Sequence, residues 1–332
     1  MTPQPTALPR RHRGAFRLGA ILGVIVLLAI AGAGVWWNSK PKRADVVEYP
    51  MIRSTDMPVA VAVGPDDTVW FSIDFSDAIG RLRGGKVERI TKPGKNVDAL
   101  GLAVDPQGNA WYADAPATAM LRVTPSGEIH GVPLATPIAR LGRVATGADG
   151  SVWFAESTAY SVSSIRGGKL ERHDIPSVRG GPFGVAVARD GTAWATLQSS
   201  NALMRIPPAG APQEIEIPTR GVAPTDIAVA PDGGVWFIEF RANQVGRYAD
   251  GKFTEIPMPE GIGALSGIAV TPDGSAWFGA MKGAAIGRVR NGEVTLFKLP
   301  REDAKPFTLA TDSKGNLWYA DIRGFVGRMT PR

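Results

Sequence analysis

The sequence predicts an all-β protein, a seven-bladed β-propeller closed by an N-terminal outer strand and preceded by one N-terminal transmembrane helix. The main observation is a repeat. Seven tryptophans follow one another at intervals of 41 or 42 residues: Trp70, Trp111, Trp153, Trp194, Trp236, Trp277 and Trp318. A period of about 40–45 residues is the length of one four-stranded propeller blade. The chain also holds 40 glycines and 27 prolines, which favours short strands joined by tight turns.

The chain divides into four segments. Residues 1–17 form a basic cytoplasmic tail, 18–37 a transmembrane signal anchor, 38–44 a linker, and 45–332 the propeller. The anchor is a run of 20 residues without a charge, long enough to cross a bilayer as a helix, although a long cleaved signal peptide remains an alternative. Four arginines precede it, so the positive-inside rule predicts a single-pass protein of the inner (cytoplasmic) membrane with the propeller on the extracytoplasmic side.

The charge distribution argues against a nucleic-acid-binding protein. The formal net charge is +6, but residues 1–43 hold 7 of the 37 basic residues and no acidic residue. The remaining 30 basic residues face 31 acidic ones, so the propeller has no excess of positive charge for phosphate. The chain has no cysteine, which excludes disulfides, a thiol nucleophile and thiolate metal ligands.

Each repeat unit predicts four short strands. In the fifth unit the apolar runs are 226–230, 235–239, 245–248 and 253–257. Asp232-Gly233 and Asp250-Gly251 lie between them and are hairpin signals, because glycine supplies the positive φ that tight turns need. Each tryptophan falls in the second strand of its unit. We expect its ring to fill the space between neighbouring blades.

The two ends of the repeat predict how the ring closes. The seventh unit stops after its third strand, because the chain ends at Arg332. The missing outer strand is found at the other end: residues 46–50 read VVEYP, like the outer-strand text FTEIP at 253–257. We therefore expect residues 45–52 to complete the seventh blade and leave no open sheet edge.

The repeat text resembles the streptogramin B lyase (virginiamycin B lyase) family. The shared text is Ile-Ala-Val, Pro-Asp-Gly and Trp-Phe, then Ile/Val-Gly-Arg, then a glycine and a short strand that ends in proline. This resemblance implies the propeller fold and an elimination that opens a cyclic depsipeptide at its ester. It also implies a Mg²⁺ ion as Lewis acid and a histidine that moves the proton.

The sequence departs from the resembled family at the positions that carry this chemistry. Ser266 and Phe307 stand where the family has its histidines, and Lys305 stands where it has a glutamate. Phenylalanine cannot transfer a proton, and a lysine inverts the charge of a metal-binding carboxylate. The chain's three histidines are His12 in the basic tail and His130 and His173, which we expect in outer strands as surface or blade-packing residues. No catalytic residue is therefore assigned, and Mg²⁺ is implied by the resemblance alone.

A candidate ligand site remains at the mouth of the central channel. The third residue after each repeat tryptophan is a carboxylate in four units, at Asp114, Glu156, Glu239 and Asp321. With Thr225, Ser266, Phe307 and Lys305 these residues would form an acidic mouth with an aromatic floor for a cation or cationic ligand. The alternative is structural: the four carboxylates would pair with the arginines that recur in the third strands.

Three functions stay open at this point. The first is a membrane-anchored binding module for a peptide, a protein or a cell-envelope ligand. The second is a lyase of the resembled family, or a divergent relative that uses carboxylates in place of histidine. The third is a structural partner in an envelope complex. Fold alone does not decide among them.

Overall fold

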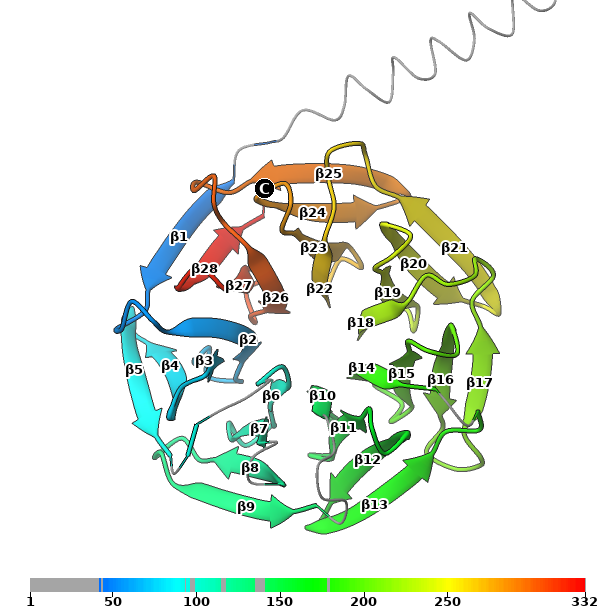
Figure 1. The fold of residues 1–332 in the computed structure, drawn as a ribbon, viewed down its shortest axis with the longest axis horizontal. Coiled ribbons are helices and arrows are strands. Elements are labelled where there is room, and N and C mark those ends of the chain that lie inside the picture. The colour runs from blue at the N-terminus through cyan, green and yellow to red at the C-terminus, as the bar shows by residue number, and fades with distance from the viewer. Residues whose placement is uncertain are drawn as a thin grey trace, which may run out of the picture. The chain divides into compact units, whose positions relative to one another are not determined.

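The structure, a computed structural model, describes residues 42, 44–92, 94–95, 99–114, 118–134, 141–177 and 180–331. Seven four-stranded antiparallel sheets surround one axis in a ring (Figure 1). The predicted seven-bladed propeller is therefore confirmed. The predicted helix at 18–37 lies outside the described residues. Within the residues that are described, we find no helix of the length and hydrophobicity needed to span a membrane.

The blades follow chain order, each with its first strand innermost and its fourth strand outermost. Blade 1 consists of β2 (Met57–Val63), β3 (Val69–Asp74), β4 (Ala78–Arg83) and β5 (Lys86–Thr91). Blade 2 consists of β6 (Leu102–Val104), β7 (Ala110–Asp114), β8 (Ala119–Val123) and β9 (Ile129–Pro133). Blade 3 consists of β10 (Leu141–Thr146), β11 (Val152–Glu156), β12 (Ser161–Arg166) and β13 (Lys169–Asp174). Blade 4 consists of β14 (Pro182–Val187), β15 (Ala193–Leu197), β16 (Ala202–Ile206) and β17 (Gln213–Glu216).

The remaining blades have the same pattern. Blade 5 consists of β18 (Pro224–Val229), β19 (Val235–Glu239), β20 (Gln244–Ala249) and β21 (Lys252–Pro257). Blade 6 consists of β22 (Leu265–Val270), β23 (Ala276–Ala280), β24 (Ala285–Arg290) and β25 (Glu293–Lys298). Blade 7 consists of β26 (Pro306–Thr311), β27 (Leu317–Asp321), β28 (Phe325–Thr330) and, from the other end of the chain, β1 (Asp45–Pro50).

Each repeat tryptophan lies in a second strand and packs against the following blade, as predicted. Trp277 of β23 is buried with Leu309, Leu317 and Tyr319 of blade 7. Trp318 of β27 is likewise buried with apolar residues of blade 1. The same arrangement recurs at every interface, because the other five tryptophans each belong to a core cluster shared with the next blade. The apolar core therefore lies between the blades.

The register of the second and third strands explains why the pairs Trp-Phe and Gly-Arg recur together. The antiparallel register of blade 6 sets Trp277 opposite Arg288 and Phe278 opposite Gly287. The guanidinium of Arg288 lies 5.4 Å from the centre of the Trp277 ring, at cation–π distance. A Cβ on Gly287 would lie 2.1 Å from the Phe278 ring, so only glycine leaves space for that ring. The motif thus fixes how two neighbouring strands pack.

The ring closes as the sequence predicts. β1 pairs antiparallel with β28 from Asp45 to Pro50, a little shorter than the predicted 45–52. Tyr49 of β1 stacks on Trp318, with ring centres 6.0 Å apart. The predicted linker also contacts the propeller, because the Lys42 backbone N–H donates to the carbonyl of Leu296 at 2.7 Å. The first and last described strands are therefore joined in one sheet.

Replacing Trp277 with alanine tests the packing between the blades. The side chain is 1% exposed, so Trp277→Ala should lower the free energy of unfolding by about 3–5 kcal/mol. Denaturant titration of the purified propeller measures this quantity. Phe75→Ala serves as a control, since Phe75 is 65% exposed and its loss should change stability by less than about 0.5 kcal/mol. Equal effects of the two substitutions would contradict the assignment of the core.

Candidate functional site

Two kinds of connection share one face of the propeller, which we call the loop face. They run from the second to the third strand of a blade and from the outer strand to the next inner strand. The hairpin turns on the opposite side form the turn face. The predicted carboxylates Asp114, Glu156, Glu239 and Asp321 are the last residues of β7, β11, β19 and β27. All four side chains are buried. The structure places each one inside its own blade and does not bring them together around the channel.

Three of the four buried carboxylates have a donor or a cation of their own. The ammonium group of Lys92 lies 2.7 Å from Asp114. The Ser163 hydroxyl donates to Glu156, and the guanidinium of Arg301 pairs with Asp321. The alternative prediction named the wrong cations, because the arginine of the third strand lies over the tryptophan ring in five blades. The partners come instead from loops and from neighbouring strands.

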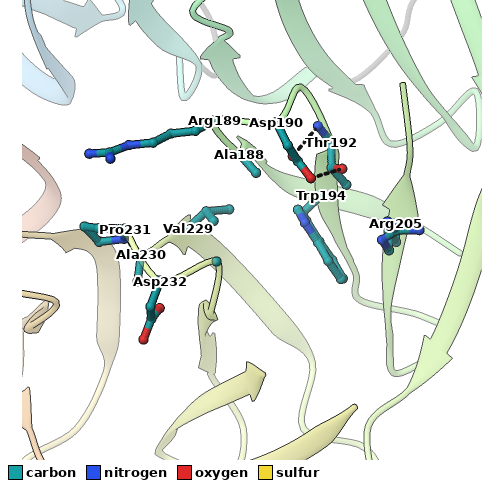
Figure 2. A pocket seen from close by; sticks show the side chains of 11 residues that line it. Ala188, Arg189, Asp190, Thr192, Trp194, Arg205, Val229, Ala230, Pro231 and Asp232 are labelled. Carbon is teal, nitrogen blue, oxygen red and sulfur yellow. Dashed lines mark hydrogen bonds between the residues drawn. The ribbon is translucent and has the colours of Figure 1, made fainter. Parts of the chain in front are cut away.

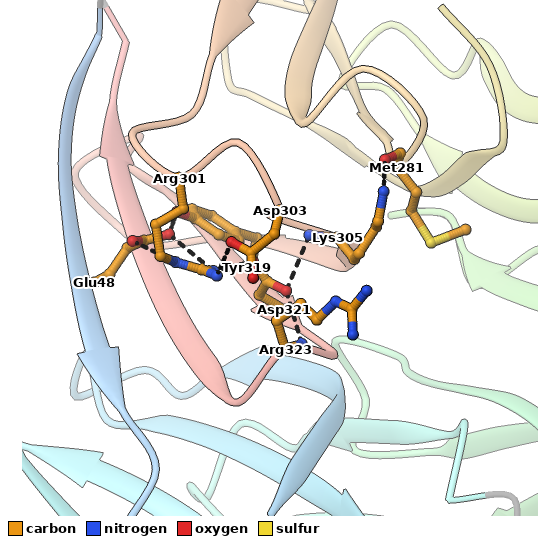
Figure 3. A network of polar contacts seen from close by, with 8 residues as sticks. All are labelled: Glu48, Met281, Arg301, Asp303, Lys305, Tyr319, Asp321 and Arg323. Carbon is orange, nitrogen blue, oxygen red and sulfur yellow. Dashed lines mark hydrogen bonds and ion pairs between the residues drawn. The ribbon is translucent and has the colours of Figure 1, made fainter. Parts of the chain in front are cut away.

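The network in blade 7 joins the two ends of the chain (Figure 3). Arg301 lies between two carboxylates: its Nε donates to Glu48 of β1 at 2.9 Å, and its Nη2 donates to Asp321 of β27. The Tyr319 hydroxyl also donates to Glu48, at 2.9 Å. Burial opposes the charge on Arg301, but the two carboxylates outweigh it and raise the pKa of the guanidinium. A cation between two acids thus fixes β1 against β27.

Lys305 is also part of this network. Its backbone N–H donates to Asp321 Oδ1 at 3.0 Å, and its ammonium group donates to the Met281 carbonyl at 2.8 Å. Both oxygens of Asp321 are therefore engaged by donors of the protein. Across the described part of the chain, no group of three or more histidine, aspartate or glutamate residues could hold a metal ion. These residues do not fit the Mg²⁺ ion that the family resemblance implies at this place.

Glu239 in blade 5 is the exception among the four. Its side chain is fully buried, and neither carboxyl oxygen has a hydrogen-bond donor among the described residues. The group it faces is a second acid, Glu255 of β21. Burial first, and then the negative charge of Glu255, raise the pKa of Glu239 to about 8. Two neighbouring carboxyl groups are stable when they share a proton or a cation.

The predicted histidine-equivalent positions are occupied by packed side chains. The Ser266 hydroxyl is buried and donates to the Pro306 carbonyl at 2.6 Å. Thr225 lies at the corresponding position of β18, and its carbonyl accepts from the hydroxyl of Thr196. The first bond joins the inner strands β22 and β26, and the second joins β15, the second strand of blade 4, to the inner strand β18 of blade 5. Ser266 and Thr225 therefore have structural bonds within the ring.

Sequence reasoning missed the residue that lies across the channel, Arg143 of β10. Its guanidinium lies 5.5 Å from the Phe183 ring and 5.4 Å from the Phe307 ring. It donates to the Leu100 carbonyl at 2.8 Å and lies 3.4 Å from Asp226. These partners belong to blades 4, 7, 2 and 5, so a single side chain from blade 3 contacts four other blades.

A signal for Arg143 was present in the repeat. The strand register aligns Arg143 and Asp226 with Gly184 of blade 4, one residue after the histidine-equivalent position. At this position the other blades have small residues: Ala60, Gly101, Gly184, Gly267 and Thr308. Two opposite charges among small residues therefore mark a pair inside the channel. The same register makes Gly142 the histidine-equivalent residue of blade 3.

The two histidines of the propeller lie where the sequence predicts, in outer strands. His173 of β13 stacks on Trp153 with ring centres 5.0 Å apart, in the blade that has Ser164 in place of the stacking arginine. Burial lowers the pKa of His173. His130 of β9 is exposed at the surface, 3.8 Å from Glu128. Neither imidazole lies at the channel.

Two hollows lie on the turn face. One pocket of about 300 Å³ lies between the first hairpin turns of blades 4 and 5 (Figure 2). Arg189, Asp190, Trp194 and Asp232 line it, and Asp190 accepts hydrogen bonds from Thr192. A second pocket of about 200 Å³ is lined by the corresponding turns of blades 4, 5 and 6 together with Thr311 of blade 7. The predicted site residues line neither pocket.

Comparisons with known proteins agree on one family. A model described as the virginiamycin B lyase family matches residues 41–206 and 189–332. A curated virginiamycin B lyase of Nocardia farcinica is 32% identical over 207 residues, which are 61% of this chain and 70% of the relative.

Solved structures share the fold. A streptogramin B lyase has a TM-score of 0.81 at 23% identity, with 86% of this chain and 97% of the other covered. A virginiamycin B lyase of Staphylococcus aureus, solved with quinupristin as a catalytically inactive histidine-to-alanine variant, has a TM-score of 0.78 at 24% identity over 87% of this chain and 99% of the other. A propeller described as bound to the D1 peptide has a TM-score of 0.70 at 12% identity over 88% of this chain and 100% of the other.

The raised pKa of Glu239 predicts a pH dependence of stability. Folded protein keeps a proton on Glu239 up to about pH 8, while the unfolded chain loses it near pH 4.5. Between these values the folded state binds more protons, so the free energy of unfolding should fall by up to about 1.4 kcal/mol per pH unit and level off above pH 8. Glu239→Gln removes this contribution. Urea midpoints from pH 6 to 9 measure it, and identical slopes for the wild type and the variant would contradict it.

Proposed function

This chain belongs to the virginiamycin B lyase family, and from that membership we propose that it is a binding module built on the lyase fold. Its ligand is a peptide, a protein or a component of the cell envelope. A helix at residues 18–37 anchors it in the inner membrane, and the propeller lies on the extracytoplasmic side.

The observation that carries this proposal is the absence of histidine near the channel. The chain has only three histidines, one in the N-terminal tail and two on outer strands. Ser266 and Phe307 occupy the positions where the family has histidine. A serine hydroxyl bonded to a carbonyl and a phenyl ring cannot serve as the proton carrier for the elimination. The related Staphylococcus enzyme is inactive when one histidine is replaced by alanine, yet that variant was solved with quinupristin. Loss of the histidine is therefore compatible with binding.

The channel supports the same conclusion. Arg143 places a positive charge between the rings of Phe183 and Phe307, and its pair with Asp226 crosses the space beside Phe307. Lys305 and Arg301 engage Asp321 from two sides. A substrate ester would meet cations and phenyl rings here, and the carboxylate of Asp226 is already paired with Arg143.

Exposed aromatic side chains on the loop face supply a binding surface. Phe75, Tyr160 and Phe240 are 65%, 46% and 46% exposed, and they lie in the connections between the second and third strands of blades 1, 3 and 5. Exposed aromatic rings are typical of surfaces that bind other molecules. The peptide-bound propeller at 12% identity shows only that the fold accommodates a peptide.

A divergent lyase is the second candidate. The 32% identity to a curated virginiamycin B lyase favours it, as does the pKa of about 8 at Glu239, which lies near the range useful for proton transfer. The burial of Glu239 inside blade 5 argues against this role, because a general base must reach its substrate.

A turnover assay separates these two functions. The purified propeller is incubated with a cyclic depsipeptide such as quinupristin and with Mg²⁺, and ring opening is followed by mass spectrometry. We expect no ring opening above the rate without protein, because no histidine of the described residues lies at the channel. The Nocardia farcinica relative serves as the positive control. Ring opening by this protein that is lost in Glu239→Gln would establish the divergent lyase instead.

The proposed anchor has its own test. The full chain should remain with the membrane fraction after washing with high salt, because a transmembrane helix is held by apolar burial and not by surface charge. A chain that begins at residue 41 should be recovered in the soluble fraction. Protease added to intact cells or spheroplasts should degrade the propeller of the full chain. Protection from the protease, or release of the full chain by salt, would contradict the anchored topology.

A further inference from the structure

We propose that Glu239 and Glu255 of blade 5 form a binding site for one small divalent cation of the Mg²⁺ class. The site lies on the face of blade 5 that packs against blade 4. It is separate from Arg143 and Asp226 in the channel and from Lys305 of blade 7, which stands where the family has a glutamate. The inference does not rest on the proposed binding function.

The repeat allows the acid pair of blade 5 to be compared with the equivalent positions of blade 7. Glu239 of β19 and Asp321 of β27 are both the third residue after a repeat tryptophan. Glu255 lies opposite Gly246 in blade 5, and Glu48 lies opposite Gly327 in blade 7. The two blades therefore hold a pair of acids at the same positions.

Blade 7 fills the space between its two acids with a cation. Arg301 is five residues before the first strand of blade 7, and its guanidinium contacts both Glu48 and Asp321 (Figure 3). The residue five before the first strand of blade 5 is Thr219. Its hydroxyl and backbone N–H donate to Glu255 at 2.9 and 3.3 Å, so the loop takes the same course without a positive charge.

Two other side chains of this site in blade 5, Glu239 and Gln244, have oxygen atoms without a donor among the described residues. Both carboxyl oxygens of Glu239 are buried, and no described residue donates to them. The side-chain oxygen of Gln244, the residue paired with Glu239 across the two strands, is also buried without a donor. The buried charge of Glu239 and the partly exposed charge of Glu255 repel each other, so a cation that lies between them stabilises the folded chain.

The chemistry of the available oxygens selects the kind of cation. Carboxylate, amide and hydroxyl oxygens are ligands for hard cations. Mg²⁺ is commonly held by one or two carboxylates and keeps several waters, whereas Ca²⁺ takes six to eight oxygens. Two carboxylates with the Gln244 oxygen nearby fit the first pattern. Glu255 is partly exposed and Thr219 is exposed, so the ion can enter from the surface.

The competing occupant is a proton shared by the two acids. A proton satisfies the pair at low pH, but it is released as the pH rises through the pKa of Glu239 near 8. Metal binding requires the deprotonated pair and becomes tighter as the pH rises. The two occupants therefore differ in their response to Mg²⁺ at alkaline pH.

Thermal unfolding at pH 8.5 tests the site. Wild-type protein is compared with and without Mg²⁺ at equal ionic strength. At about a hundredfold excess over Kd, we expect Mg²⁺ to raise Tm by roughly 5 °C. Glu239→Gln should lose this shift. Thr219→Arg, which supplies blade 5 with the cation that blade 7 has, should also lose it while it keeps the metal-free Tm at or above that of the wild type.

Glu216→Gln is the matched control, because it removes an exposed acid of β17 outside the pair and should keep the full shift. Direct binding is read from the electron paramagnetic resonance of Mn²⁺, which should report one bound ion per wild-type chain and none in Thr219→Arg. No Mg²⁺ shift in the wild type, or an equal shift in Glu239→Gln, would overturn the metal site and leave the shared proton as the occupant.

Discussion

The packing of each tryptophan against the following blade is the interaction on which the rest of this structure depends. A blade contributes its indole ring to a core that the next blade completes, so no blade has a full core alone. The last blade must therefore meet the first. Two contacts accomplish this: Trp318 is buried among residues of blade 1, and β1 adds the outer strand that β28 lacks. Removal of one ring disturbs two blades at once, which makes the propeller a single cooperative unit.

The repeat explains how much of the fold could be predicted. Strands, turns and the closing strand follow from chemistry that recurs at a fixed interval. The similarity of residues 46–50 to 253–257 was enough to place β1. The pair of Arg143 and Asp226 was not predicted, because its meaning depends on two strands that face each other across the axis. The carboxylates after the tryptophans were found by position, but their burial was not foreseen. Each of these carboxylates has a different neighbouring group in its blade.

The residues at the candidate site are held in place by contacts with other blades. Inter-blade bonds such as Ser266 to Pro306 join neighbouring blades of the ring. Arg143 adds contacts to four other blades at the place where a ligand would enter the channel. The chain thus has the fold of its family, and the described residues of its inner strands make bonds that hold neighbouring blades together. Binding places fewer demands on residue identity than proton transfer does.

The buried acids after the repeat tryptophans can be compared between blades, and one of the four lacks the partner that the others have. Asp114, Glu156 and Asp321 have Lys92, Ser163 and Arg301 as partners, so the protein itself satisfies three of the four. The fourth faces Glu255, and the loop that brings Arg301 to blade 7 brings Thr219 to blade 5. Without a cation between them, the repulsion between Glu239 and Glu255 would destabilise blade 5. The pair of acids can be retained if an ion or a proton from solution takes the place of the guanidinium. The stability of blade 5 would then depend on the ions and the pH of the solution.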